Sequence, residues 1–383
     1  MKTVYLDYAS TAPRNADILR AKQEFELSHY ANVWRGLYTL AEDAEEHYQA
    51  SKKTVANWIG CEPVEVLYTY SATYGINLIT LALEHNEILG KWDTVLLSQS
   101  EHHANIVPWQ ILAERVGITI KFVKLDENFQ IDMEHLESLL DDSVKIVSFQ
   151  YASNVTGAVH SLEKVRNIIG KDRLFFIDAT QMAVHNHIDM RWLWADAVVF
   201  SGHKIGADTG IGILALWKVL QKAWKCPIGG GGAINFVSET THEQAGIPEK
   251  WQPGTPHITG AVSLKLAIDF LSNISEEERQ EKKELVQYTN TLFQALAEKW
   301  SIQLFHSNTP DALGIWSFVV PNKHSNDITE ALDEYGICVR SGHHCCDPLH
   351  QSWWVFGTLR VSIGHKTTQE EIDYFFEKLG VLL

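Results

Sequence analysis

The stretch Phe200-Ser201-Gly202-His203-Lys204 decides the fold, because its lysine closely follows an apolar run, 197–200, that predicts a buried strand. A second apolar run, 174–177, ends in Asp178. In open α/β sheets, ligands bind at the edge formed by the carboxyl ends of the strands. The two runs therefore predict an amine and a carboxylate at one edge of a sheet.

This pair of side chains suits pyridoxal phosphate (PLP). That cofactor needs a lysine for a Schiff base and an acid partner for its pyridinium nitrogen. The simpler interpretation is a solvated Lys204 that caps a strand and an Asp178 that starts a turn, since most lysines lie on the surface. The remaining residues have to decide between the two interpretations.

Strands and helices alternate through most of the chain, which predicts an α/β fold with a mostly parallel sheet flanked by helices. Predicted strands occupy residues 66–70, 94–98, 118–123, 145–150, 174–178, 197–200, 212–217, 302–305 and 314–319. Predicted helices occupy residues 16–28, 40–58, 106–116, 133–140 and 162–169, a long stretch from 263 to 300, and the C-terminus from Gln369. The four glycines at 229–232 predict a flexible loop. We expect a large domain of residues 1–262, with residues 1–15 packing on a smaller α+β domain of residues 263–383.

The composition argues against several classes of protein. The 383 residues carry a formal net charge of −16, which disfavours nucleic acid as a partner. No apolar run approaches the roughly 20 residues of a membrane span, and residues 1–6 meet Asp7 too early for a secretory signal. The five cysteines include no CxxC pair, so a disulfide framework is not expected. These features predict a cytoplasmic protein that handles a small molecule.

Polar residues recur after successive predicted strands. Ser71-Ala72-Thr73 joins a strand to a helix, where backbone N–H groups and the helix dipole favour a phosphate, although an ordinary N-cap also explains it. Ser153-Asn154 and Asp178-Ala179-Thr180-Gln181 follow two further strands. This recurrence favours a ligand-binding edge over a set of unrelated turns.

A second candidate region is the loop Arg340-Ser341-Gly342-His343-His344-Cys345-Cys346-Asp347-Pro348. A cysteine attacks as a thiolate, and a nearby arginine or protonated histidine lowers the pKa of the thiol. Four consecutive ligands cannot surround one zinc ion without strain, and the adjacent His102 and His103 point apart, so we expect no metal at either place. A structural loop with incidental cysteines is the alternative. Arg360, amid apolar residues, either forms a salt bridge at the core edge or clamps a carboxylate.

Four stretches together resemble the group II, or Suf-type, cysteine desulfurases of the class V branch of fold-type I PLP enzymes. They are Glu101-His102-His103-Ala104-Asn105-Ile106-Val107-Pro108-Trp109, Ser201-Gly202-His203-Lys204, Gly254-Thr255-Pro256 and Arg340-Ser341-Gly342-His343-His344-Cys345. The resemblance runs from about Tyr5 to the C-terminus. The lysine stretch is common to the superfamily, whereas the first and last stretches are far more specific to this branch.

The resemblance implies the fold-type I architecture, PLP as cofactor and a role for each matching residue. Lys204 would bind PLP as a Schiff base, Asp178 would hold the ring nitrogen, Gln181 the ring oxygen, and His102 would stack on the ring. Ala72, Thr73, Ser201 and His203 would hold the phosphate, Asn154 would lie beside cofactor and substrate, and Thr255 would reach the second subunit's cofactor in a homodimer. Arg360, with Arg340 nearby, would bind the carboxylate of L-cysteine. Cys345 would accept the sulfur as a persulfide, leaving L-alanine, and a SufE- or SufU-type acceptor would take it on for iron–sulfur cluster assembly.

We expect four departures from the family pattern. The sequence starts almost at the stretch that contains Tyr5, without the leading helix usual in the family. Trp34 stands where many relatives have histidine, Ser71-Ala72 replaces the commoner Gly-Thr, and Cys346 replaces a small residue such as alanine. Two other functions stay open. One is selenocysteine lyase or another PLP-dependent β-elimination. The other is a PLP-free scaffold that binds metal or sulfur, which leaves the polar strand ends unexplained.

Overall fold

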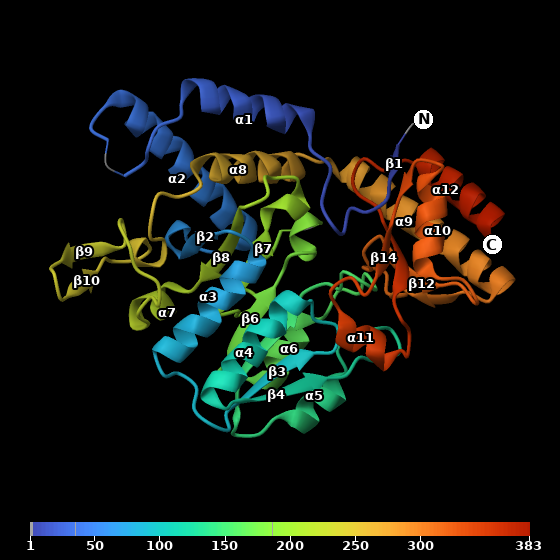
Figure 1. The fold of residues 1–383 in the computed structure, drawn as a ribbon, viewed down its shortest axis with the longest axis horizontal. Helices are drawn as coiled ribbons and strands as arrows, with labels where there is room; N and C mark the ends of the chain where they lie inside the picture. Colours follow the sequence, from blue (N-terminus) through green and yellow to red (C-terminus); the bar gives the residue numbers. More distant parts are fainter. Residues whose placement is uncertain (1–2, 35, 186) are drawn as a thin grey trace.

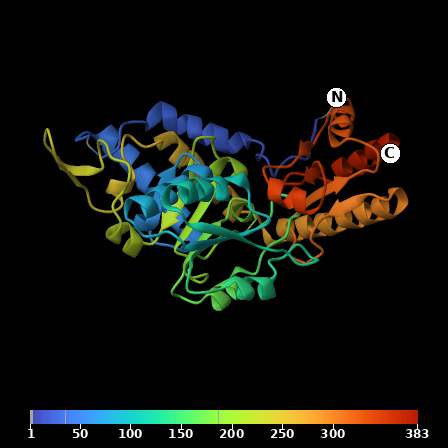
Figure 2. The same ribbon diagram turned by 60° about the horizontal axis from the view of Figure 1, so that its bottom comes forward.

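The computed structural model describes residues 3–34, 36–185 and 187–383, which form a large lobe and a small lobe (Figures 1 and 2). Both ends of the chain lie at the small lobe (Figure 1). The prediction about a secretory signal rests on residues 1–6, and two of these, Met1 and Lys2, lie outside the described residues. None of the described helices combines the length and apolar character needed to cross a membrane.

A seven-stranded sheet with the order β2-β8-β7-β6-β5-β3-β4 forms the centre of the large lobe. The five strands from β7 to β4 are parallel, whereas β8 pairs antiparallel with both β7 and β2. The strands are β2 (Val66–Thr69), β3 (Thr94–Ser98), β4 (Thr119–Val123), β5 (Val144–Gln150), β6 (Leu174–Asp178), β7 (Ala197–Ser201) and β8 (Gly212–Leu216). The predicted α/β fold with a mostly parallel sheet is confirmed.

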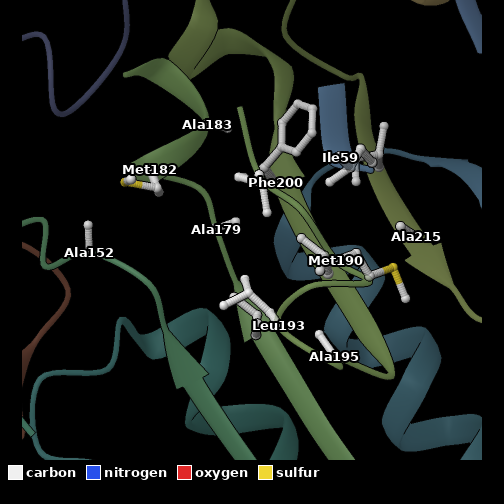
Figure 3. Close-up of a cluster of buried hydrophobic side chains, with 14 of the residues drawn as sticks. Ile59, Ala152, Ala179, Met182, Ala183, Met190, Leu193, Ala195, Phe200 and Ala215 are labelled. Atoms are coloured by element: carbon white, nitrogen blue, oxygen red, sulfur yellow. The ribbon is translucent and has the colours of Figure 1, made fainter. Parts of the chain in front are cut away.

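Helices cover both faces of this sheet, because successive residues of each central strand point to opposite sides and both sides are apolar. In β7, Val199 packs in the core under α3 and α4, while Val198 and Phe200 pack in the core under α2, α5, α6 and α8. Figure 3 shows Phe200 among the small side chains of Ala179 and Ala183. The helices are α1 (Ala16–Ser28), α2 (Thr39–Ile59), α3 (Ala72–His85), α4 (Val107–Val116), α5 (Met133–Leu139), α6 (Leu162–Ile169), α7 (Lys218–Ala223) and α8 (Ile258–Ser272).

The small lobe contains an antiparallel sheet with the order β11-β12-β15-β14. Its strands are β11 (Gln303–Phe305), β12 (Ile315–Val319), β14 (Arg340–Gly342) and β15 (Thr358–Ser362), and its helices are α9 (Glu276–Trp300), α10 (Ser325–Asp333), α11 (Asp347–Ser352) and α12 (Gln369–Leu382). The N-terminal strand β1 (Val4–Tyr5) pairs in parallel with β13 (Ile337–Cys338), and Val4 and Leu6 are buried in the core of this lobe. The chain therefore starts in the small lobe and then enters the large one.

One local prediction was wrong, and one element was not predicted. The stretch from 263 to 300 is two helices, because Ser275 and Glu278 form a capping box that starts α9 after the end of α8 at Asn273. The glycine run at 229–232 leads into an unpredicted hairpin of β9 (Ile234–Val237) and β10 (His242–Gln244). This hairpin projects from the end of the large lobe away from the small lobe (Figures 1 and 2).

The boundary expected between residues 262 and 263 falls within α8. The second half of that helix contributes Leu264, Ala267, Ile268 and Leu271 to the core beneath the large sheet. A division inside a packed helix would split one core, so we propose a boundary at the turn between α8 and α9 instead.

The absence of a side chain at Gly212 allows α3 to begin close to the end of β7. A Cβ at this position would lie 2.7 Å from the Ser71 Cα and 2.8 Å from the Phe200 carbonyl oxygen. Both neighbours are backbone atoms of elements that are fixed by the sheet. Any side chain at position 212 must therefore displace the strand-to-helix junction that precedes α3.

We expect Gly212→Ala to lower the thermal unfolding midpoint by about 1–5 °C, since overpacking of this kind costs roughly 1–3 kcal/mol. Gly229→Ala is the matched control, because no heavy atom lies within 4 Å of the Cβ position there. Differential scanning fluorimetry of both variants makes the comparison. Equal midpoints for the two variants would show that the junction tolerates a side chain.

Candidate active site

Lys204 lies in the 3-10 turn η4 (Gly202–Ile205), directly after β7. Its Nζ donates a hydrogen bond to the carbonyl oxygen of Ala9 at 2.6 Å. Burial, with the positive charge of Arg360 as a further cause, lowers the pKa of Lys204 to about 8. A lysine amine reacts only when it is neutral, so this environment makes Lys204 reactive in the weakly alkaline range.

Asp178 ends β6, the strand next to β7, and is buried. Its Oδ1 accepts a hydrogen bond from the Thr180 backbone N–H at 2.9 Å. Burial raises the pKa of Asp178, against the opposing effects of the Thr180 hydrogen bonds and the Lys204 charge. Gln181, in the same turn, donates from Nε2 to the Ala9 carbonyl at 3.0 Å. The structure thus brings Lys204 and Gln181 to one carbonyl oxygen at the edge that carries Asp178.

The start of α3 meets the end of β7 beside this edge. The Ala72 backbone N–H donates to Ser201 Oγ at 2.9 Å, and both residues are buried. Thr73 is exposed in the first turn of α3. His203 contacts Thr11 instead, with 3.2 Å between Nδ1 and Oγ1, and burial lowers the pKa of His203 to about 4. Ala72 and Ser201 are therefore hydrogen-bonded to each other, whereas His203 contacts Thr11 of the N-terminal segment.

A buried polar network holds His102 at the end of β3. Glu101 is fully buried and accepts hydrogen bonds from the Gln150 backbone N–H at 2.9 Å and from Asn105 Nδ2 at 2.8 Å. Asn105 Oδ1 accepts in turn from Trp109 Nε1 at 3.0 Å. Burial, followed by repulsion from Lys204, lowers the pKa of His102 to about 3, so its imidazole is neutral. A neutral, fixed ring is suited to stacking on another ring.

Residues 101–109 therefore play two roles: Glu101, Asn105 and Trp109 form an internal network, and His102 lies beside that network at the candidate site. Glu101, Asn105 and Trp109 satisfy one another in the interior, which is the only way such polar groups are accommodated there. Burial raises the pKa of Glu101 to about 8, so the network includes a carboxyl group that is easily protonated. The sequence alone indicated His102 as functional and gave no role to its three neighbours.

The Cys345 loop is bonded to the same region. The His103 backbone N–H donates to the Cys345 carbonyl oxygen at 2.8 Å, and His103 Nε2 lies 2.9 Å from Asp347 Oδ2. His344 and Cys345 both have positive φ, at 52° and 58°, a conformation that costs non-glycine residues about 1–2 kcal/mol each. Burial holds the pKa of His344 well below its usual value, so this histidine is neutral and does not supply the positive charge expected beside the thiol. Cys345 itself is partly exposed.

Asn154 connects the strand edge to the cysteine loop. Its Nδ2 donates to the His344 carbonyl oxygen at 2.9 Å, and its Oδ1 accepts from Cys346 Sγ at 3.2 Å. Cys346 is fully buried, and burial raises the pKa of its thiol. The two neighbouring cysteines are therefore unequal, since only Cys345 reaches the surface and Cys346 packs inside.

Arg340 and Arg360 face each other across β14 and β15. Arg360 is buried and donates to Asn154 O at 3.0 Å, to Asp7 Oδ1 at 2.9 Å and to Ser10 Oγ at 2.8 Å. Arg340 donates to the same Ser10 Oγ at 2.9 Å. The sequence left a salt bridge or a carboxylate clamp open for Arg360. The ion pair with Asp7 exists, and Arg340 is the more exposed of the two guanidinium groups.

Thr255 lies apart from these contacts, exposed in the loop between the β9–β10 hairpin and α8. Sequence reasoning missed Asp7, Ala9 and Ser10, which supply the partners of Lys204, Arg340 and Arg360. The polar residues of this N-terminal stretch carry no spacing that indicates a site. Their role follows from the pairing of the N-terminal segment with the small lobe.

The comparisons with known proteins agree with this arrangement. The chain is 34% identical over 386 residues to a probable cysteine desulfurase of Pyrococcus abyssi, covering 100% of this chain and 94% of that protein. The apo cysteine desulfurase of Thermococcus onnurineus NA1 superposes with a TM-score of 0.92 at 30% identity, covering 99% of this chain and 94% of that one. The Escherichia coli cysteine desulfurase CsdA, in an S-sulfonic acid form, gives 0.91 at 28% identity and the same coverage. Residues 4–375 match the aminotransferase class-V family, and the chain belongs to that family.

Proposed function

We propose that this chain is a PLP-dependent cysteine desulfurase, which converts L-cysteine to L-alanine and holds the sulfur on Cys345. One observation carries the proposal. A partly buried lysine of lowered pKa, Lys204, lies at a sheet edge beside the buried Asp178. The backbone of the partly exposed Cys345 is hydrogen-bonded to the backbone of His103, beside the same edge. The desulfurases among the relatives and the similar structures support the same activity.

The side chains at this edge fit PLP. The Asp178 carboxyl group is buried and its pKa is raised, so a cationic N–H donor such as a pyridinium would stabilise its charged form. The Ala72 N–H and Ser201 Oγ lie at the N-terminus of a 14-residue helix, which suits a phosphate, with Thr73 and His203 as further donors. Gln181 would contact the ring oxygen, and Asn154 would lie beside cofactor and substrate. His102 would stack on the ring. Lys204 would bind the cofactor covalently.

PLP, when bound, supplies an electron sink for the charge left by removal of the substrate Cα proton. Lys204 is the group placed to accept that proton, because its lowered pKa leaves it neutral in a useful fraction of molecules. Its present partner, the Ala9 carbonyl oxygen, is a neutral acceptor that the amine can leave without breaking an ion pair. Release from Ala9 is therefore the local movement that activates Lys204.

Arg340 and Arg360 would bind the substrate carboxylate. Two guanidinium groups on directly opposed residues repel each other, and Asp7 offsets only one of the charges. A second carboxylate between them removes the remaining repulsion and accepts bidentate hydrogen bonds. The substrate carboxylate would thus offset the guanidinium charge that Asp7 leaves unbalanced.

Cys345 would take the sulfur by attack of its thiolate on the substrate sulfur. An S–S bond forms as the substrate Cβ–S bond breaks, and the electron pair of the broken bond stays with the carbon fragment. That fragment takes a proton at Cβ, regains at Cα the proton held by Lys204, and leaves as L-alanine. The backbone at His344 and Cys345 is strained and held by a few hydrogen bonds, so the loop can change conformation at low cost. Cys346 cannot substitute for Cys345, since it is enclosed and un-ionised.

A homodimer and a protein sulfur acceptor complete the proposal. The projecting hairpin exposes the apolar side chains of Phe236 and Val237. Thr255 is also exposed, which contact with the cofactor of a second subunit would require. Trp354 and Phe356, which follow α11 and the cysteine loop, are 92% and 96% exposed beside a groove of about 390 Å³. These aromatic residues would anchor an acceptor of the SufE or SufU type that delivers sulfur for iron–sulfur cluster assembly. All five cysteines are free, which accords with a reducing cytoplasm.

The pH dependence of cofactor uptake tests the role of Lys204. Apoprotein mixed with PLP should form the borohydride-reducible linkage faster as pH rises from about 6.5, levelling off above the Lys204 pKa of about 8, because only the neutral amine attacks. The peptide containing Lys204 should carry the label in mass spectrometry, and Lys204→Ala should carry none. A midpoint near 10.5, the ordinary lysine value, would contradict the proposed environment.

The two adjacent cysteines give a paired test. Cys345→Ser should keep the absorbance of bound cofactor and lose at least about 100-fold in alanine formation from cysteine, because its hydroxyl cannot accept the sulfur. Cys346→Ser should retain activity within about fivefold, since serine preserves the hydrogen bond to Asn154 and the position is closed to substrate. Equal losses in both variants would assign sulfur transfer to both thiols. Full activity of Cys345→Ser with selenocysteine but not cysteine would favour selenocysteine lyase.

The acceptor surface is tested with Trp354→Ala, using a SufE-type and a SufU-type protein in separate titrations. The acceptor concentration that gives half-maximal stimulation should rise at least about fivefold, since exposed aromatic anchors carry much of the binding energy in an interface. Trp92→Ala is the matched control, an exposed tryptophan (70%) that follows α3 and is remote in sequence from the cysteine loop. Identical titrations for the two variants would exclude Trp354 from the docking surface.

A further inference from the structure

Three metal-ligand side chains meet on the surface of the large lobe, outside the proposed active site. His29 caps the C-terminus of α1, while Asp43 and His47 are four residues apart on one face of α2. His29 Nδ1 lies 2.5 Å from Asp43 Oδ2, and the two imidazole centroids are 4.9 Å apart. One ligand atom from each of the three side chains lies within 4.8 Å of the other two. Two helices thus place two nitrogens and one carboxylate around a common point.

The packing around the cluster fixes its rings. Phe25, which is buried, lies 6.3 Å from the His29 ring, nearly parallel to it, and 5.2 Å from the His47 ring. His47 Nδ1 is 3.0 Å from the Asp43 carbonyl oxygen, to which it donates a hydrogen bond. The same Nδ1 lies 3.7 Å from Asp43 Oδ1, so the side of the ring that meets the backbone carbonyl also faces the Asp43 carboxylate. The packing therefore keeps both histidine rings beside Asp43.

We propose that His29, Asp43 and His47 bind one divalent transition-metal ion, such as Zn²⁺ or Co²⁺, between α1 and α2. Two imidazoles and one carboxylate suit ions of intermediate softness, whereas Mg²⁺ and Ca²⁺ prefer oxygen ligands. The three side chains are 37%, 34% and 39% exposed, which leaves room for water as a further ligand. The net charge of −16 also favours cation uptake.

The ion replaces the hydrogen bond between His29 and Asp43. Two ligands of a tetrahedral ion with bonds of about 2.0 Å lie roughly 3.3 Å apart, so these side chains have to separate by about 1 Å. Both side chains are partly exposed, so a shift of this size moves them toward solvent and leaves the packed core in place. Because α1 and α2 both pack on α8, the ion acts as a clamp between helices that the core already aligns. Its effect is on stability, and it takes no part in the chemistry at Lys204.

The test uses the PLP-loaded full chain with the additional change Cys345→Ser, which removes the accessible thiol as a competing ligand. Co²⁺ is added in equilibrium dialysis, and the bound metal is measured together with its visible absorption bands and the thermal midpoint. We expect about one Co²⁺ per chain, tetrahedral-type bands and a midpoint raised by several degrees. His47→Gln should lose the bound ion and the rise in midpoint.

Two further variants separate metal binding from folding. His47→Gln leaves the His29–Asp43 contact intact, so its midpoint without metal should stay within about 2 °C of the background. Glu46→Gln removes one negative charge from the same turn of α2, on an exposed side chain outside the cluster, and should keep the ion. Absence of bound Co²⁺ at 1 mM in the background, or equal binding in His47→Gln and Glu46→Gln, would overturn the proposal.

Discussion

The hydrogen bond between the partly buried amine of Lys204 and the carbonyl oxygen of Ala9 is the constraint on which the site depends. Withdrawing a charged group from water is costly unless it has such a partner. The N–H of Ala9 donates to Ser362 Oγ in β15 of the small lobe at 2.9 Å. Ala12 N–H donates to the His203 carbonyl oxygen at 3.1 Å beside the lysine. One short N-terminal segment thus joins the edge of the large sheet to the sheet of the small lobe.

The ion pair between Asp7 and Arg360 makes the second connection along this segment. Arg360 also donates to the backbone of Asn154, so a small-lobe arginine contacts the N-terminal segment and the large lobe together. A buried ion pair contributes little net stability when its desolvation is counted, but removing one partner leaves the other charge uncompensated. Here the ion pair fixes the position of Arg360. Arg340, Arg360 and Lys204 gather positive charge at one point of an acidic chain, which favours an anionic ligand at that point.

The sequence predicted the elements whose signals are local. The buried strands ending at Asp178 and Ser201 were readable from their apolar runs, and α1 and α6 were predicted to the residue. That these two strands are neighbours in the sheet came from the structure. The split between α8 and α9 was missed because its signal, the Ser275–Glu278 capping box, is polar and lies inside a helical pattern. Ala9 could not be predicted at all, since its contribution is a backbone carbonyl oxygen placed by long-range pairing. The unequal burial of Cys345 and Cys346 likewise depends on how α11 packs, which adjacency in sequence does not reveal.

A crystal structure of the protein loaded with PLP tests the central claim most directly. The account predicts continuous electron density from Lys204 Nζ to the cofactor, an Nζ that has left the Ala9 carbonyl oxygen, and an Asp178 carboxylate oxygen within hydrogen-bond distance of the ring nitrogen. Cofactor bound elsewhere, with Lys204 still on Ala9 and Asp178 contacting only Thr180, would contradict it.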